Sequence, residues 1–147
     1  MPMGDSVADL KKRQVEAQLS GTTLQTQPVS GTVVASTAAG SPISVVSAAT
    51  TNFAVLRNAA ASLFELSASN PTATPAFVKL YNKATTPTVA DVPVLTIEVL
   101  AGKTVPLEFG RIGKRFAAGI SIGITGAVAA NDATIAPVGV QVHGTYI

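Results

Sequence analysis

Most of this 147-residue chain consists of short segments in which apolar residues alternate with polar or small ones, and no helical pattern follows residue 20. Such a period of two is typical of β-strands, because successive side chains of a strand point to opposite faces. The clearest segment is residues 76–83, where one face carries Phe77, Lys79 and Tyr81 and the other Val78 and Leu80. About eight or nine such segments, separated by Gly, Pro and Asn turn signals, predict an all-β fold. We expect an antiparallel β-sandwich or jelly-roll-like domain over residues 31–147.

Residues 115–124 alternate in an unusual way, because one of their faces carries only small residues. The large face comprises Phe116, Ala118, Ile120, Ile122 and Ile124, and the small face comprises Ala117, Gly119, Ser121 and Gly123. A face of small residues lets another backbone approach closely, which suits either the domain interior or a subunit contact. Since the stretch from Phe116 to Asn131 holds no acidic residue and no charge at all, we expect other protein to cover it.

Residues 1–30 differ in composition from the rest of the chain. Residues 5–20 hold six charges that cancel, together with good helix formers, and predict a short helix that needs a partner surface. A tract without charged residues follows from Ala17 to Leu56, and its start predicts an extended arm, with a disordered tail as the equal alternative. We expect this segment to contact neighbouring subunits through Leu10, Leu19, Leu24, Gln25, Gln27 and Val29.

The composition argues against several classes of protein. Only 12% of residues are charged, against about 25% in typical soluble domains, which suits a surface that other subunits cover. The chain has no cysteine and a single histidine, so we expect no disulfide, no metal and no cofactor. The start of the chain shows no secretory signal, and the apolar segment from Phe116 to Ala130 is too short and glycine-rich to span a bilayer, so we expect no membrane.

One motif suggests catalysis, and its context speaks against it. Residues 119–123 match the G-x-S-x-G pattern of a nucleophilic serine, and Asp132 and His143 follow Ser121 in the order found in α/β-hydrolases. That nucleophile needs a strand, a sharp turn and a helix, whereas Ser121 lies within an alternating strand pattern. We therefore interpret Ser121 as a packing residue, Asp132 as a turn residue and His143 as a residue of a polar face. We expect no enzyme.

Basic residues gather in the segment 103–115, which has a net charge of about +3. We favour a solvated hairpin tip, ahead of an electrostatic contact with an acidic protein surface. Nucleic acid is the weakest alternative, because no aromatic residues are interleaved with these charges. We include three of the basic residues among the assembly contacts, namely Arg111, Lys114 and Arg115.

The second half of the chain resembles a known group of proteins. The residues that carry the resemblance are 77–84, the loop 85–89, residues 93–97 and the glycine-rich segment 115–131. They are similar to small virion proteins encoded among the head and tail genes of tailed bacteriophages, over about residues 76–147. The resemblance implies a non-enzymatic structural subunit of the virion, such as a capsid decoration (cement) protein.

On this basis we expect a homo-oligomer, most plausibly a trimer, that binds the major capsid protein or other virion subunits and stabilises the assembled lattice through its N-terminal segment. One alternative places the protein in the neck, tail or fibre of the particle. Another is a β-sandwich that binds carbohydrate or a host surface. With no Trp and only Tyr81 and Tyr146 as tyrosines, the chain offers a poor aromatic platform for that role.

Overall fold

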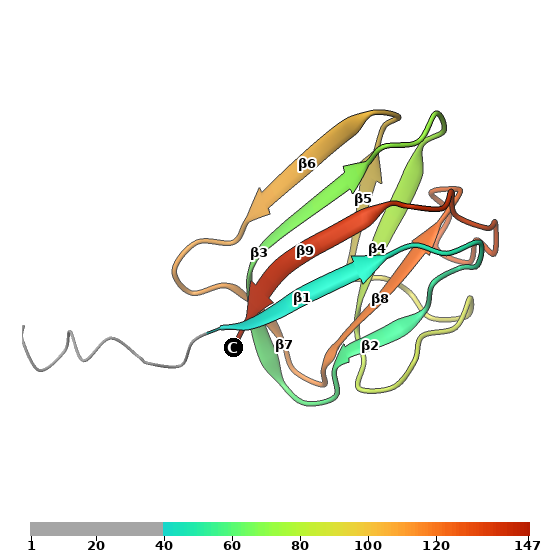
Figure 1. Cartoon of the computed structure of the whole chain (residues 1–147). Helices are drawn as coiled ribbons and strands as arrows, with labels where there is room; N and C mark the ends of the chain where they lie inside the picture. Colours follow the sequence, from blue (N-terminus) through green and yellow to red (C-terminus); the bar gives the residue numbers. More distant parts are fainter. Residues whose placement is uncertain (1–39) are drawn as a thin grey trace, which may run out of the picture. The chain divides into compact units, whose positions relative to one another are not determined.

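The alternating segments form antiparallel strands in the computed structural model, which describes residues 40–147. This part of the chain contains strands, turns and loops and no helix, so the all-β prediction is confirmed for it (Figure 1). No helix in the described part is long and apolar enough to cross a membrane. The strands are β1 (Ser41–Val46), β2 (Ala54–Arg57), β3 (Ala61–Asn70), β4 (Ala76–Asn82), β5 (Leu95–Val99), β6 (Lys103–Glu108), β7 (Lys114–Phe116), β8 (Ile120–Thr125) and β9 (Gln141–Tyr146).

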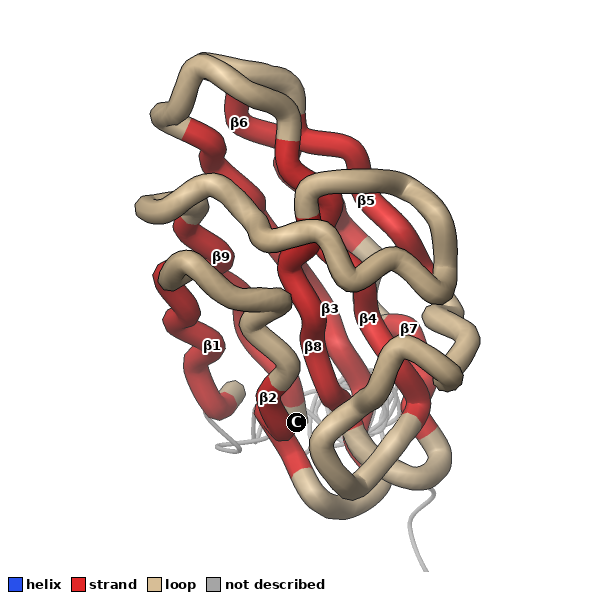
Figure 2. Tube along the Cα trace, turned by 90° about the vertical axis from the view of Figure 1, so that its right-hand side faces the viewer, coloured by secondary structure: helices blue, strands red, loops and turns tan. Residues whose placement is uncertain are grey.

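The strands form two antiparallel sheets that face each other (Figure 2). Sheet A has the order β1-β9-β3-β6, and the short β7 also pairs with β3. Sheet B has the order β2-β8-β4-β5. Because β6 and β7 pair with successive parts of β3, they act as one interrupted strand. Counted in this way, the chain crosses from one sheet to the other at every connection except that between β4 and β5, which are neighbours in sheet B.

The core lies between the sheets and is built from the inward-facing member of each alternating pair. β3 shows the pattern most clearly, since Leu63, Leu66 and Ala68 are buried and Glu65 is exposed. The register of β3 against β9 shifts between Leu63 and Glu65. Because of this shift, Leu63 before Phe64 and Leu66 after it both point into the core. The core residues of the other strands include Ile43, Val78, Leu80, Ile97, Val99, Phe116, Ile120, Ile122, Ile124 and Val142, and Val140 joins them from just before β9.

The outer strands of sheet A each contain a proline. Pro42 lies in β1 and Pro106 lies in β6. Proline cannot donate to a sheet ladder and is therefore confined to edge strands, which is where both residues are found.

Several strand predictions hold in detail and one needs correction. The predicted segments 76–83 and 94–100 correspond to β4 and β5. The segment 115–124, expected as one alternating strand, is divided between β7 and β8, which belong to different sheets. The predictions for the N-terminal part lie outside the described residues: the short helix, the arm, the domain boundary at residue 31, and the contacts of Leu10, Leu19, Leu24, Gln25, Gln27 and Val29.

Candidate functional site

The outer face of sheet B is covered by loops of the same chain, contrary to the expectation that other protein covers the small face of residues 117–123. Ser121 is buried and its hydroxyl donates to the carbonyls of Lys83, at 2.7 Å, and Thr85, at 3.1 Å. Over Gly123 lies the ring of Phe53, which meets Tyr81 edge to face with ring centroids 6.1 Å apart. The small side chains therefore make room for the chain's own loops.

A lysine is buried in this covered face. Lys79 on β4 has no exposed surface, and its Nζ donates to the carbonyl of Ala129, at 2.5 Å, in the loop of residues 126–135. Desolvation lowers the pKa of Lys79, and the nearby charge of Asp132 partly opposes that effect. The alternation of residues 76–83 assigned Lys79 to the correct face, but gave no sign that the face is covered.

Asp132 holds the loop of residues 126–135 together. Its carboxylate accepts hydrogen bonds from the backbone N–H of Ala127 and from both the backbone N–H and the hydroxyl of Thr134. Partial burial of the carboxyl tends to raise its pKa, but these hydrogen bonds outweigh burial and lower the pKa to about 2. The prediction that Asp132 is a turn residue is confirmed, and its role is to organise the loop that closes over Lys79.

Replacing Asp132 with asparagine is expected to reduce the free energy of unfolding by about 1 kcal/mol at pH 7, after allowing for solvent screening of a partly exposed group. Because the folded-state pKa is depressed, this contribution is present above the ordinary pKa of 3.8 and is lost as the pH falls through about 2. Urea denaturation of the wild type and of Asp132→Asn between pH 7 and 2 should show the two stabilities converging in acid. A constant difference across that range would contradict the assignment.

The residues of the hydrolase-like motif are not brought together. Ser121 lies beneath the loops of sheet B, Asp132 bonds to Thr134 within its own loop, and His143 is exposed on the outer face of sheet A. Each residue therefore lies where the sequence interpretation placed it: Ser121 is packed, Asp132 lies in a turn and His143 is on an exposed polar face. In the described part of the chain, no group of three or more His, Asp or Glu side chains is placed to hold a metal ion.

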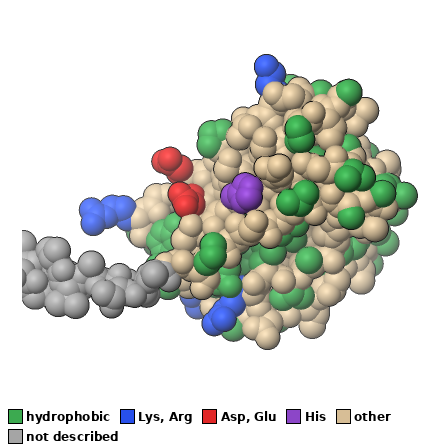
Figure 3. Space-filling view, viewed as in Figure 1, with side chains coloured by type: hydrophobic (Ala, Val, Ile, Leu, Met, Phe, Trp, Pro, Cys, Tyr) green, Lys and Arg blue, Asp and Glu red, His purple; other side chains and the backbone are tan. Residues whose placement is uncertain are grey.

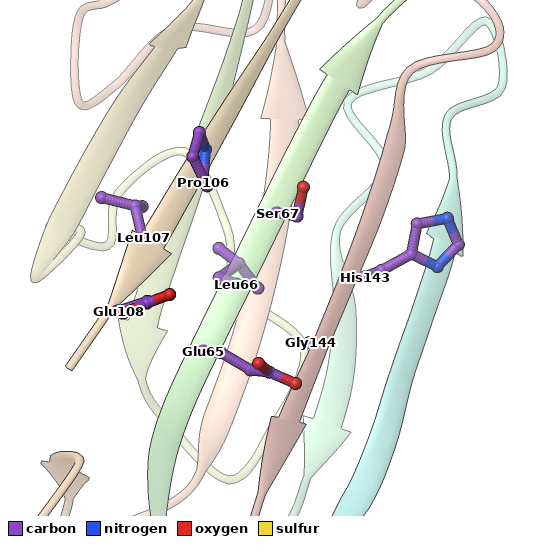
Figure 4. A pocket seen from close by; sticks show the side chains of 8 residues that line it. All are labelled: Glu65, Leu66, Ser67, Pro106, Leu107, Glu108, His143 and Gly144. Atoms are coloured by element: carbon purple, nitrogen blue, oxygen red, sulfur yellow. The ribbon is translucent and has the colours of Figure 1, made fainter. Parts of the chain in front are cut away.

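The outer face of sheet A is open, and no described segment lies over it (Figure 3). Across its middle, Ser44, His143, Ser67 and Pro106 pair in register from β1 to β6. Ser67 is small and stands between two larger neighbours, so the face has a hollow of about 200 Å³ there (Figure 4). Its lining includes Glu65, Ser67, Pro106, Glu108, His143 and Gly144.

Two carboxylates stand beside this hollow. Glu65 on β3 and Glu108 on β6 are directly opposite each other in the sheet register. Like charges in such a position destabilise a sheet slightly. Glu65 also accepts a hydrogen bond from the hydroxyl of Thr145, at 2.8 Å. The hollow therefore has an acidic rim, which the sequence analysis did not find, because Glu65 and Glu108 are 43 positions apart and only the β3 to β6 register brings them together.

Three of the four cations predicted to cluster are found at one end of sheet A. Arg111 lies in the turn between β6 and β7, and Lys114 and Arg115 belong to β7 itself. Lys103 is at the far end of β6, opposite Asn70, and is not part of the group. The prediction of a hairpin in the segment 103–115 is also wrong, because its two strands, β6 and β7, both pair with β3 and not with each other.

The turn itself presents an apolar side chain that sequence reasoning missed. Gly110 and Gly113 have φ angles of +68° and +72°, in the left-handed region that favours glycine, and the N–H of Gly113 donates to the carbonyl of Gly110 at 3.3 Å. Between them, Arg111 and Ile112 project from the tip, and Ile112 is 89% exposed. We call residues 110–113 the tip turn. The available signal was an Arg-Ile pair between two glycines in a basic segment.

Comparison with known proteins identifies no relative: no family model, no curated protein and no solved structure matches this chain.

Proposed function

We propose that this protein is a non-enzymatic structural subunit of a tailed-phage virion, most plausibly a decoration protein that binds the assembled capsid as a homo-oligomer, for which a trimer is the favoured state. The proposal begins from the resemblance of residues 76–147 to small phage virion proteins. Neck, tail or fibre is the alternative location within the particle. In each case the protein acts by binding and needs no catalytic group.

The observation that carries the proposal is the contrast between the two outer faces. Sheet B is closed by the chain's own loops, which fill the space over Ser121 and Gly123. No segment of residues 40–147 covers sheet A over three neighbouring strands, where the face has a hollow with an acidic rim. An open face of this kind suits a subunit that contacts other subunits.

The strand order supports the same proposal. If β6 and β7 are counted as one interrupted strand, eight antiparallel strands are divided equally between two sheets of order β1-β9-β3-β6 and β2-β8-β4-β5, and only β4 and β5 are consecutive strands of the same sheet. We infer from this order a β-sandwich of the jelly-roll type. Jelly rolls are common in viral capsid proteins and also in lectins, so the fold favours these two classes without choosing between them.

Binding to the assembled lattice alone would stabilise the particle by mass action. A ligand that binds only the assembled state shifts the equilibrium towards it by RT ln(1 + [L]/Kd), which is about 2.7 kcal/mol at a concentration of 100 Kd. Many copies on one capsid multiply this contribution. A low charge of 12% is tolerated because much of the surface is covered in the particle.

Deleting residues 1–30 is expected to leave a folded domain that no longer binds capsids. The described part supports the first half of this expectation, because residues 40–147 contain a core of their own that draws on both sheets. Co-sedimentation of the full-length and truncated proteins with purified capsids measures binding, and thermal melting of both proteins is the control for folding.

Equal co-sedimentation of the truncated protein would overturn the role assigned to the N-terminal segment. Absence of co-sedimentation for the full-length protein would overturn the capsid assignment itself. The number of copies per particle then separates the two locations, since a decoration protein is present in hundreds of copies and a neck or fibre protein in about a dozen.

The carbohydrate-binding alternative loses one of its two candidate aromatic residues. Tyr81 is 1% exposed and packs against Phe53, so its ring cannot serve as a platform for a sugar. Tyr146 is partly buried, and its hydroxyl donates to the carbonyl of Leu56 at 3.4 Å. Selective binding to a glycan array would restore this alternative.

A further inference from the structure

The tip turn presents an exposed apolar side chain beside an exposed cation. Ile112 is 89% exposed and does not fill the hollow of its own sheet. The turn is closed by the hydrogen bond from the N–H of Gly113 to the carbonyl of Gly110, which leaves Arg111 and Ile112 at its apex. An exposed large apolar residue at the apex of a turn, next to a cation, has the form of an interface anchor.

The hollow on sheet A has the complementary properties. Its volume of about 200 Å³ is below the range of roughly 300–1,000 Å³ that is usual for small-molecule sites, and it suits one inserted side chain. Pro106 on β6 and His143 on β9 are the register neighbours of Ser67, and both residues line the hollow. The carboxylates of Glu65 and Glu108 stand at one end, where they can accept hydrogen bonds from a guanidinium.

We propose that the tip turn of one copy docks into the sheet A hollow of a second copy, with Ile112 entering the hollow and Arg111 pairing with Glu65 and Glu108. The charges argue for a second copy as the occupant. The tip carries Arg111, with Lys114 and Arg115 close behind it in the sequence, and the hollow carries two carboxylates. Complementary charges of this kind guide association and fix the register of an interface.

The contact is compatible with two kinds of assembly. Two copies can exchange tip turns about a two-fold axis, or the tip-to-hollow contact can repeat head to tail and close into a ring when the rotation between subunits allows it. The inference rests on the proposed function in that it supplies the contact by which the copies of an assembly subunit join. It can nevertheless be tested without capsids.

The test is sedimentation equilibrium of the purified full-length protein. The wild type is expected to form a discrete oligomer, and Ile112→Ser and Arg111→Glu are each expected to raise its dissociation constant at least about tenfold. Two control variants should have the same dissociation constant as the wild type. Lys103→Glu makes the same charge change at the other end of β6, and Val128→Ser removes an apolar side chain that is 63% exposed in the loop of residues 126–135.

A charge exchange completes the test. Glu108→Arg alone should weaken the oligomer, whereas Arg111→Glu combined with Glu108→Arg in one chain should restore much of the association, because every interface then regains an opposite pair. Since all these residues are exposed, the variants should remain folded, and thermal melting detects any folding defect. A small shift in melting temperature is expected only where Glu108→Arg removes the like-charge pair with Glu65. A monomeric wild type, unchanged association of the tip variants, or a double variant no better than the single ones would overturn the inference. Capsid co-sedimentation of the wild type would still decide the proposed function separately.

Discussion

Replacing Gly144 with alanine is expected to lower the free energy of unfolding by about 3 kcal/mol, which is a large share of the roughly 5–15 kcal/mol available to a domain of this size. Gly144 lies in β9 opposite Leu66 of β3, close to the register shift at Phe64. A Cβ at this position would overlap the carbonyl oxygen of Glu65 and lie 3.1 Å from Leu66 Cδ1. Since the obstacle is backbone in the middle of a sheet, relief requires a movement of β3 against β9.

Gly102 provides the matched control for this substitution. It lies in the turn between β5 and β6 with a φ angle of +68°, and a Cβ there would meet no atom within 4 Å. Gly102→Ala should therefore cost only the backbone strain of about 1–2 kcal/mol. Guanidinium denaturation of both variants measures the difference, and equal losses would show that steric overlap at Gly144 is relieved without a shift of the strands.

Replacing Lys79 with alanine is expected to cost about 3 kcal/mol, whereas Lys79→Met should remain within about 1 kcal/mol of the wild type. Both variants remove the hydrogen bond to Ala129, but only alanine also empties the space beneath the loop of residues 126–135. Methionine refills that space with an apolar chain and removes the desolvation cost of the ammonium group. The comparison separates packing from charge at this buried position.

The pH dependence gives a second measure of the same residue. Burial lowers the pKa of Lys79 below 10.5, so folding favours the neutral amine and the unfolded chain binds more protons in that interval. The contribution of Lys79 to stability should therefore rise as the pH increases from its folded-state pKa towards 10.5. Denaturation at pH 7 and pH 10 should show that the free energy of unfolding of the wild type increases relative to that of Lys79→Met. An unchanged difference would mean that Lys79 is as well solvated as in the unfolded chain.

Much of the secondary structure could be predicted because it depends on local patterns. Phe77, Val78 and Leu80 define the two faces of β4 without any knowledge of its neighbours. The same pattern failed at residues 117–119, where alternation continues through a connection between two sheets. Composition and periodicity do not show where a strand leaves one sheet and enters another, since small residues suit both a strand and a tight crossing.

The candidate sites were harder to predict because they depend on contacts between distant residues. The small face of β8 was recognised, but nothing local to Ser121 and Gly123 shows that the chain's own loops cover them. The hollow exists only because β3 aligns Ser67 with Pro106 on one side and His143 on the other. Arg111 was found from charge alone, whereas the part played by Ile112 depends on its exposure.

The prolines in β1 and β6 have a consequence for contacts between copies of this protein. In the described part of the chain β1 and β6 are the edge strands of sheet A, and an edge strand offers unpaired backbone groups on which further strands could grow, as in amyloid. Pro42 and Pro106 each remove one donor from these strands. Addition of strands from other copies at these two edges is therefore disfavoured.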